Sequence, residues 1–194
     1  MEFLDIAGLV KGASYGEGLG NQFLSHIRDV DAVIHVVRLF EDENVSHVEG
    51  SLDPIRDINI VETELLLRDI ASVDKRMEKL IKTARIGDKK SKIDLAMMEI
   101  ILPKMNDGIM VHDIKLEKDQ HGRIHQMALL TAKPVLYVAN VDEDEILAEN
   151  RGKNILKLFT FAEKRGNAAI RLCGNLEAEI APLPDKEKAA FLLE

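Results

Sequence analysis

The sequence predicts an α/β protein, a parallel β-sheet with helices on both faces, into which an α-helical coiled-coil subdomain is inserted. Three apolar runs have the continuous, β-branched or aliphatic character of strands buried in a parallel sheet; they occupy 32–37, 135–139 and 168–172. The stretch between the first two runs is mostly helical in its periodicity. We therefore expect a sheet domain formed by 1–53 and 131–194, and a helical insertion at 54–130.

The composition indicates an aliphatic core and no intrachain disulfide. Hydrophobic residues make up 46% of the 194, aromatic residues only 4%, and Cys173 is the single cysteine. A lone cysteine fits a reducing compartment, and no apolar run approaches the ~20 residues that span a bilayer. We therefore expect a cytoplasmic protein without a membrane partner. The net charge of −8 argues against general coating of nucleic acid, so no DNA specificity is expected, but it allows a local basic patch.

The N-terminal segment carries the first candidate site. Residues 2–6 are predicted to form a short strand that ends near Asp5, and a glycine-dense loop follows as far as Gly20. A carboxylate at a strand end can hold Mg²⁺, and Gly8, three residues later, lets a backbone N–H approach a γ-phosphate. This Asp-x-x-Gly spacing occurs in P-loop NTPases. Alone it is a weak signal, because any strand that ends in a tight turn can show it.

Helical patterns begin after the glycine loop and return in the insertion. Residues 19–29 are predicted to be helical, and residues 38–53 to form a polar loop. A helix is then expected from about 58 to 85, with apolar residues at the 4-3-4-3-4 spacing of a coiled-coil seam; they are Leu66, Ile70, Val73, Met77, Leu80 and Ala84.

A turn at Gly87 and Asp88 is expected to end the first long helix, with Asp88 capping a second helix at 89–105. The apolar positions of that second helix are Ile93, Met97, Ile100 and Ile101. Pro103 is expected to kink or end it. A third helix is predicted at 118–131.

The last part of the chain returns to alternating strands and helices. The strand at 135–139 leads into Asn140-Val141-Asp142-Glu143, a helix is expected at 150–165, and the strand at 168–172 leads into Cys173-Gly174-Asn175. A short helix and a helix that starts at Asp185 are expected to follow. Ligands of open α/β sheets bind at the carboxyl ends of the strands. The three strand ends therefore predict one nucleotide site, in the order found in a G domain.

A resemblance to a known family covers almost the whole chain. The matching segments are Phe3-Leu4-Asp5-Ile6-Ala7-Gly8-Leu9-Val10-Lys11-Gly12-Ala13, Gly16-x-Gly18-Leu19-Gly20-Asn21, Phe40-Glu41-Asp42, His47-Val48-x-Gly50-x-x-Asp53-Pro54, Gly87-Asp88-Lys89-Lys90, Leu130-Thr131-x-Lys133-Pro134 and Asn140-Val141-x-Glu143. Together they resemble the Obg-like ATPase (YchF) family of TRAFAC P-loop NTPases.

The resemblance implies roles for these positions, with Mg²⁺ as cofactor and ATP or GTP as substrate. Asp5 would lie near Mg²⁺ and Gly8 would face the γ-phosphate. Leu9 would replace the glutamine that orients water in many GTPases, so turnover should be slow. Nucleotide-binding positions would be Phe40, Asn140, Val141, Glu143, Cys173 and Gly174. An alternative for Phe40 is a core residue that anchors its loop.

Base preference follows from the resemblance and from chemistry. GTPases carry Asn-Lys-x-Asp, whose aspartate accepts hydrogen bonds from guanine. In this chain Val141 replaces the lysine and Glu143 replaces the aspartate. Adenine has no matching donors, and asparagine suits its N6 and N7 pattern, as in DNA readout. Because the guanine-reading residues are replaced, we expect ATP to be preferred over GTP.

One motif of the family is absent from this sequence. A P-loop NTPase cradles its phosphates with Gly-x-x-x-x-Gly-Lys-[Ser/Thr], which does not occur here. The family carries that motif and switch I upstream of Asp5, and a TGS domain near its C-terminus. The resemblance therefore implies an internal portion of a hydrolase, and we expect negligible hydrolysis from these residues alone.

A basic segment offers a second kind of site. Between residues 75 and 92, eight basic residues face two acidic ones, a net charge of +6, so the rest of the chain carries −14. The basic residues are Lys75, Arg76, Lys79, Lys82, Arg85, Lys89, Lys90 and Lys92. Such a cluster fits RNA phosphates, or simply a solvated helix face. Two hypotheses follow: part of a ribosome-associated ATPase, or a non-catalytic module that binds rRNA or protein through this hairpin.

Overall fold

A computed structural model describes residues 2–5, 27, 30–41, 52–148 and 152–191 of the chain. The chain forms two compact units. The sheet unit comprises Ile34–Ile58 and Val135–Glu194, and the helical unit comprises Met1–Val33 and Asn59–Pro134. No helix in the described part of the chain is both long enough and apolar enough to cross a membrane.

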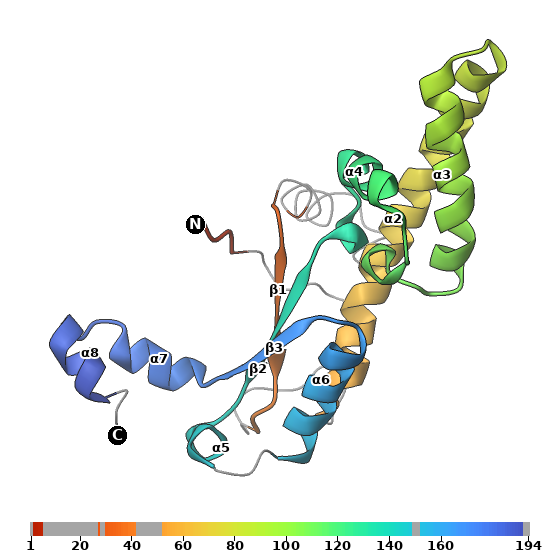
Figure 1. Cartoon of the computed structure of the whole chain (residues 1–194). Coiled ribbons are helices and arrows are strands. Elements are labelled where there is room, and N and C mark those ends of the chain that lie inside the picture. The colour runs from red at the N-terminus through yellow and green to blue at the C-terminus, as the bar shows by residue number, and fades with distance from the viewer. Residues whose placement is uncertain (1, 6–26, 28–29, 42–51, 149–151, 192–194) are drawn as a thin grey trace, which may run out of the picture. The chain divides into compact units, whose positions relative to one another are not determined.

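The sheet has three strands in the order β1 (Val33–Arg38), β2 (Val135–Asn140) and β3 (Ala168–Leu172) (Figure 1). β2 and β3 are parallel, with Leu136 opposite Ala168. The N–H of Val33 donates to Pro134 and that of Leu39 to Asn140. Because this offset is constant, β1 also runs parallel to β2. The predicted parallel sheet and the existence of its three strands are confirmed, but only β2 is an interior strand, since β1 and β3 are the edges of the described sheet.

One face of the sheet is covered by α6 (Lys153–Lys164), which lies beside it in Figure 1. Ile155, Leu158 and Ala162 of this helix form a core cluster with Tyr137 and Ala139 of β2. Side chains alternate between the faces of a strand, so the neighbours of these residues point the other way. On that opposite face Ile34, Val36 and Ile170 are exposed.

Three shorter helices complete the sheet unit. They are α5 (Glu143–Leu147), α7 (Gly174–Ile180) and α8 (Asp185–Phe191). The two closing helices were expected, and α8 begins at Asp185. The sequence analysis did not predict α5, and it placed the start of α6 at residue 150 rather than at Lys153.

The predicted strand at 2–6 is wrong over the residues that are described. Residues 2–5 form no regular structure, and Phe3 and Leu4 are exposed. A strand is stable only where a neighbouring strand satisfies its backbone N–H and C=O groups. The described sheet consists of β1, β2 and β3 alone, and none of them pairs with this segment. The predicted helix at 19–29 lies outside the described residues apart from Ile27.

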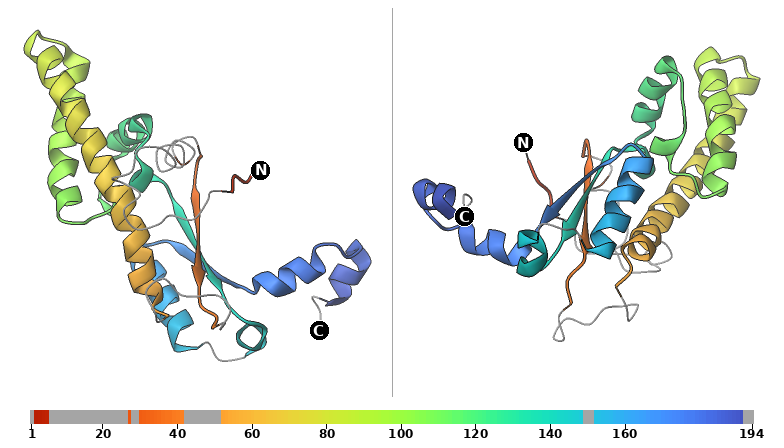
Figure 2. Two further views of the ribbon diagram at one scale, coloured as in Figure 1. Left: turned by 180° about the vertical axis from the view of Figure 1, so that it is seen from behind. Right: turned by 60° about the horizontal axis from the view of Figure 1, so that its bottom comes forward.

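The helical unit is dominated by two long helices, which Figure 2 shows side by side and joined by a tight turn. They are α2 (Pro54–Arg85) and α3 (Lys89–Asn106). A shorter helix, α4 (Lys118–Met127), and two 3₁₀ turns, η2 (Val111–Asp113) and η3 (Leu130–Ala132), follow.

The first long helix buries most of its predicted seam. Leu66 and Val73 lie in the core of the helical unit, and Ile70, Met77 and Leu80 pack against that core. They contact a cluster to which α3 contributes Met97, Met98, Ile101 and Met105.

The second long helix buries a different face from the one predicted. Met97 and Ile101 are buried as expected, but Ile93 and Ile100 are exposed and Met98 and Met105 are buried instead. The N-terminal turn of α3 also directs Asp94 inward, where it forms a 3.0 Å ion pair with Arg123 of α4. α3 is therefore rotated so that Asp94 and the methionine residues Met97, Met98 and Met105 face the interior of the helical unit.

The turn between the two helices has the predicted construction. Gly87 has φ +97°, a backbone conformation that residues with a Cβ rarely adopt. Asp88 caps α3 by accepting a 2.8 Å hydrogen bond from the N–H of Ser91. The Ser91 hydroxyl is also bonded to Thr83 of α2, at 2.7 Å. Side chains from both helices thus hold the tip together.

One boundary each of α2, α3 and α4 also differs from the prediction. α2 begins at Pro54, four residues early, because Asp53 caps it and proline suits the first helical position. α3 continues through Pro103 to Asn106, since burial of Met105 in the core retains its last turn. α4 ends at Met127, where Ala128 adopts a left-handed conformation.

Candidate nucleotide site at the carboxyl edge of the sheet

The carboxyl ends of the three strands bring predicted residues from distant parts of the chain together. Phe40 follows β1, Asn140 ends β2, and Cys173 and Gly174 follow β3. Two hydrogen bonds connect these loops. The N–H of Leu39 donates to the Asn140 carbonyl at 2.7 Å, and the N–H of Gly174 donates to Asn140 Oδ1 at 3.0 Å.

Asn140 is the centre of this arrangement. Its side-chain oxygen accepts from Gly174, so its amide group is held between β2 and the start of α7. A Cβ on residue 174 would lie 3.2 Å from that oxygen, tighter than an ordinary contact. Glycine therefore allows the loop after β3 to approach the asparagine closely.

The two residues that distinguish this motif from a GTPase motif lie in different surroundings. Val141 is only 2% exposed and belongs to the core of the sheet unit, and its N–H donates to Leu172. Its side chain is therefore enclosed by protein. Glu143 is exposed as the first residue of α5, after Asp142, which caps that helix by accepting from the N–H of Glu145 at 2.8 Å.

Phe40 is half-buried and carries a cation over its ring. The guanidinium carbon of Arg38 lies 4.7 Å from the ring centroid, and Arg38 Nε donates to the Phe40 carbonyl at 3.0 Å. These two contacts fix the ring against the end of β1. Arg38 was not among the site residues predicted from the sequence.

Cys173 is a small buried residue in this structure. It is 3% exposed and lies at the N-terminal boundary of α7 without a side-chain capping bond. Its thiol is free of any disulfide. A buried thiol of this kind behaves as a small apolar side chain. Any contribution to a ligand site would come from its backbone.

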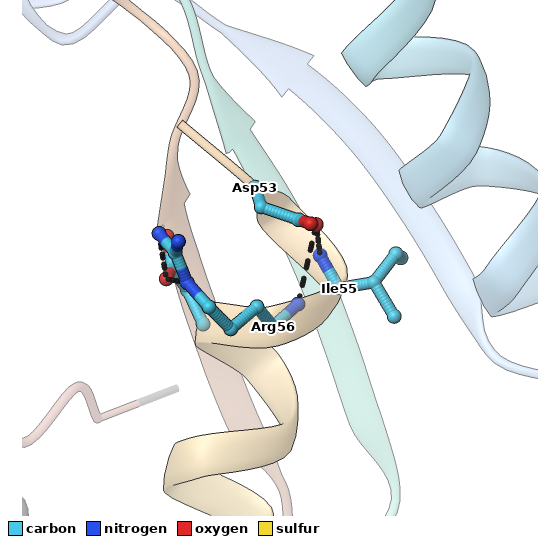
Figure 3. Close-up of polar contacts among 4 residues, drawn as sticks. Asp53, Ile55 and Arg56 are labelled. Carbon is cyan, nitrogen blue, oxygen red and sulfur yellow. Dashed lines mark hydrogen bonds and ion pairs between the residues drawn. The ribbon is translucent and has the colours of Figure 1, made fainter. Parts of the chain in front are cut away.

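The start of α2 belongs to the same unit and is anchored there. Figure 3 shows Asp53 accepting from the N–H groups of Ile55 and Arg56 with one carboxylate oxygen, at 3.2 and 3.3 Å. Arg56 in turn binds Asp57 at 3.2 Å. One turn further on, Ile58 is fully buried in the sheet-unit core. The cap and this buried residue fix where the long helix leaves the sheet unit.

Comparison with known proteins places this geometry in a family. Residues 1–75 match the protein family described as "50S ribosome-binding GTPase". "Ribosome-binding ATPase YchF" of Haemophilus ducreyi is 45% identical over 192 residues, which cover 99% of this chain and 52% of that protein. The protein of the same name in Bacillus subtilis is 43% identical, over 100% of this chain and 53% of its own length.

A solved structure agrees with the sequence comparison. The structure described as "Structure of the Schizosaccharomyces pombe YchF GTPase" matches with a TM-score of 0.76 and 33% identity, over 93% of this chain and 50% of that one. The chain belongs to the YchF family. It spans about half the length of the relatives it matches. Asn140, Phe40 and Gly174 therefore lie at the strand ends of a YchF-type nucleotide-binding fold.

The phosphate-side positions of this YchF-family chain are described only in part. Asp5 is exposed, and Gly8 and Leu9 lie outside the described residues. The described residues contain no cluster of three or more metal-binding side chains. Mg²⁺ beside a nucleotide is commonly held by one or two carboxylates together with phosphate oxygens and water. A single exposed aspartate fits that donor set, but it does not form a metal site by itself.

The predicted RNA-contact residues of this YchF-family chain are largely solvent-accessible. Arg76 is half-buried, and the other seven are exposed; these are Lys75, Lys79, Lys82, Arg85, Lys89, Lys90 and Lys92. Residues four and three apart share a helix face, so Lys75, Lys79 and Lys82 form one basic row along α2.

A polar hollow lies nearby in the same unit. Its volume is about 430 Å³, and it is lined by Lys90, Asp119, Gly122, Arg123 and Gln126. It is formed by α3 and α4 and contains none of the residues of the carboxyl edge.

Proposed function

We propose that this chain is the nucleotide-binding portion of a ribosome-associated ATPase that prefers ATP to GTP. The observation that carries the proposal is the position of Asn140. It ends the central strand, its side chain is bonded to Gly174, and Phe40 follows the end of the neighbouring strand. An amide, an aromatic ring and a close backbone loop thus lie at the sheet edge where nucleotides bind in open α/β folds, which supports a role for Asn140 in reading the base.

The preference for adenine is supported by what the site offers around that amide. Asn140 Oδ1 is already held by Gly174, which leaves the NH₂ group to donate to N7 of a purine. Adenine and guanine share N7, so this contact alone does not choose between them. A GTPase chooses guanine with an aspartate that accepts from N1–H and the 2-amino group. Here Glu143 occupies that position at the start of α5. Its side chain is one methylene longer than that of aspartate, so we expect a weaker contact with guanine.

The phosphate side of the proposal rests on the N-terminal positions. Asp5 would hold Mg²⁺ brought in with the nucleotide, Gly8 would face the γ-phosphate, and Leu9 would leave the attacking water without a side-chain hydrogen bond. Turnover in the whole protein should then be slow. A Walker-type phosphate cradle does not occur in this sequence, so we expect negligible hydrolysis by the 194-residue chain alone.

Calorimetry with ATP and with GTP in the presence of Mg²⁺ tests this proposal on the purified chain. We expect measurable ATP binding and weaker GTP binding. If GTP binds more tightly than ATP, the interpretation of Asn140 and Glu143 is wrong. If neither nucleotide binds, the sheet edge is not an autonomous nucleotide site.

A second candidate function is supported by the helical unit. The insertion, predicted at 54–130, would contact rRNA through its basic residues, which would place the protein at the ribosome in the cytoplasm. The supporting observation is the exposed row of Lys75, Lys79 and Lys82 on α2, since phosphate contacts need accessible cations rather than buried ones. Filter binding of the chain to rRNA fragments tests it. Binding that ATP does not change would favour an RNA-binding module over a nucleotide-controlled one.

A further inference from the structure

The outer side of α3 carries an apolar stripe that is exposed in the described part of the chain. Ile93 and Ile100 lie seven residues apart on α3 and are 48% and 45% exposed. Ile86, a further seven residues earlier in the turn before the helix, is 85% exposed. Ala96 and Pro103, each three residues after one of the two isoleucines on α3, are also exposed. We call Ile93, Ala96, Ile100 and Pro103 the outer stripe.

The outer stripe is separate from the face by which α3 packs inside the chain. The inward face of the helix consists of Met97, Met98, Ile101 and Met105, which are buried. A helix that is apolar on two sides has a second surface to cover. Two isoleucines that are exposed on one face of the same helix are also costly in water, whereas isolated exposed apolar residues are ordinary.

The spacing of the outer stripe matches recognition of another helix. Apolar residues that recur every seven residues, each followed by another apolar residue three positions later, form the seam of a two-helix interface. Ala96 lies between Ile93 and Ile100, and its small side chain allows a partner helix to approach the α3 backbone. Ile93 and Ile100 are separated by about 10 Å along the axis, so a partner of two to three turns would cover both.

The charges beside the outer stripe indicate which kind of helix would fit. Lys90, Lys92 and Lys104 flank it. Glu99 is the one exposed acidic residue of α3, since Asp94 is buried and paired with Arg123. Residues at these flanking positions select partners by charge. A second copy of this chain would bring lysines against lysines, which is unfavourable. Isoleucine also lacks the flat ring on which exposed RNA bases stack.

We propose that the outer stripe binds an acidic amphipathic helix of a partner protein. Apolar residues of that helix would pack on Ile93 and Ile100, and its glutamates or aspartates would face Lys90, Lys92 and Lys104. This inference does not depend on nucleotide binding or on the basic row on α2, although Lys90 and Lys92 also belong to the basic segment that is predicted to contact RNA.

Fluorescence anisotropy with two designed peptide probes tests the proposal on the full chain. Both probes are helical, of about three heptads with isoleucine and leucine at the seam; one carries glutamate and the other lysine at the flanking positions. We expect the acidic probe to bind at least about tenfold more tightly than the basic probe. Equal binding of the two probes, or no binding of the acidic one, overturns the proposal.

Variants locate the binding surface. The double substitution Ile93→Ser and Ile100→Ser should weaken binding of the acidic probe by about tenfold or more. Ala96→Glu tests the same stripe while keeping both isoleucines, and a glutamate suits an exposed helix position. Leu156→Ser is the matched control, because Leu156 is a half-exposed aliphatic residue on α6, and it should leave binding unchanged.

Two further outcomes would assign the stripe to another occupant. If the double variant loses rRNA affinity, RNA covers the stripe and the proposal is wrong. If sedimentation equilibrium shows a dimer that the double variant abolishes, a second copy covers it, and the proposal is again wrong. A monomer whose rRNA affinity is unchanged by the double variant supports the acidic helix as the occupant.

Discussion

Asn140 joins two functions in one side chain, the bracing of a loop and the proposed reading of a base. Its Oδ1 accepts from Gly174 at 3.0 Å, so an Asn140→Ala chain loses both the loop anchor and the amide donor. We expect ATP affinity to fall by at least about tenfold, together with about 1 kcal/mol of stability from the lost hydrogen bond. Calorimetry and urea unfolding measure the two effects separately.

The exposed neighbour Asn175 provides the control for that experiment. Asn175→Ala should change neither ATP affinity nor stability. If both alanine variants bind ATP as the unmodified chain does, the amide of residue 140 does not read the base.

Asp69 is a buried carboxylate of the helical unit that accepts several hydrogen bonds. It is 2% exposed and accepts from the N–H groups of Leu130 and Thr131 and from the Thr131 hydroxyl, at 2.7 to 2.9 Å. Asp69→Ala would leave three donors in the interior without this acceptor. We expect a loss of about 3 kcal/mol in unfolding free energy. Asp74→Ala changes an exposed position on the same helix and should alter stability little. A similar loss of stability in Asp74→Ala would show that the effect comes from substitution in α2 and not from the hydrogen bonds of Asp69.

Residues at the candidate site were predictable where a simple rule links them to the sheet. Asn140 and Gly174 follow apolar strands, and the carboxyl ends of parallel strands meet at one edge. Arg38 was not predicted, because its contact with Phe40 depends on a side-chain conformation that no spacing encodes. The burial of Val141 likewise depends on the core that α6 and β2 form together.

At the scale of elements, the hairpin tip has a built-in dependence on pH. Hydrogen bonds from the Ser91 hydroxyl, the larger effect, and from the Ser91 N–H lower the pKa of the Asp88 carboxyl from its usual value. The folded chain therefore favours the ionised form. Its stabilising effect is complete above the unfolded pKa of about 3.9 and is lost as pH falls through the lower, folded pKa.

Hydrogen exchange at the first turn of α3 measures this effect. Opening of that turn, after correction for the intrinsic pH dependence of exchange, should become easier in strongly acidic solution. Asp88→Asn keeps a good capping residue but has no charge to lose, so its turn should show no such acid-dependent change. The same acid response in Asp88→Asn would exclude Asp88 as its source.

Elements were predicted well where local chemistry defines them and less well where packing does. The turn at Gly87 and the cap at Asp88 are local, and both are confirmed. The rotation of α3 is not local. Its sequence offers one apolar face through Met97 and Ile101 and another through Ile93 and Ile100, and only contact with α2 and α4 selects the first. The same choice leaves the outer stripe exposed.

At the scale of the whole molecule, charge is strongly segregated along the chain. Residues 75–92 carry +6 while the chain as a whole carries −8. Replacing Lys75, Lys79 and Lys82 together by glutamine should weaken rRNA binding and reduce the slope of log affinity against log salt by about 2 for single-stranded RNA. Filter binding at several salt concentrations measures that slope.

Three exposed lysines outside the basic segment serve as the control. Lys153, Lys157 and Lys164 lie on α6 of the sheet unit. Their replacement by glutamine changes the net charge by the same amount and should leave the slope nearly unchanged. Equal effects of the two triple variants would show that rRNA responds to overall charge and not to the row on α2.

One helix belongs to both compact units of the chain. α2 starts from the capped turn at Asp53 and the buried Ile58 in the sheet unit, and its residues from Asn59 onward belong to the helical unit. Its 32 residues make a rod of about 48 Å. An unbroken run of about nine helical turns therefore connects the cap at Asp53 with the turn at Gly87.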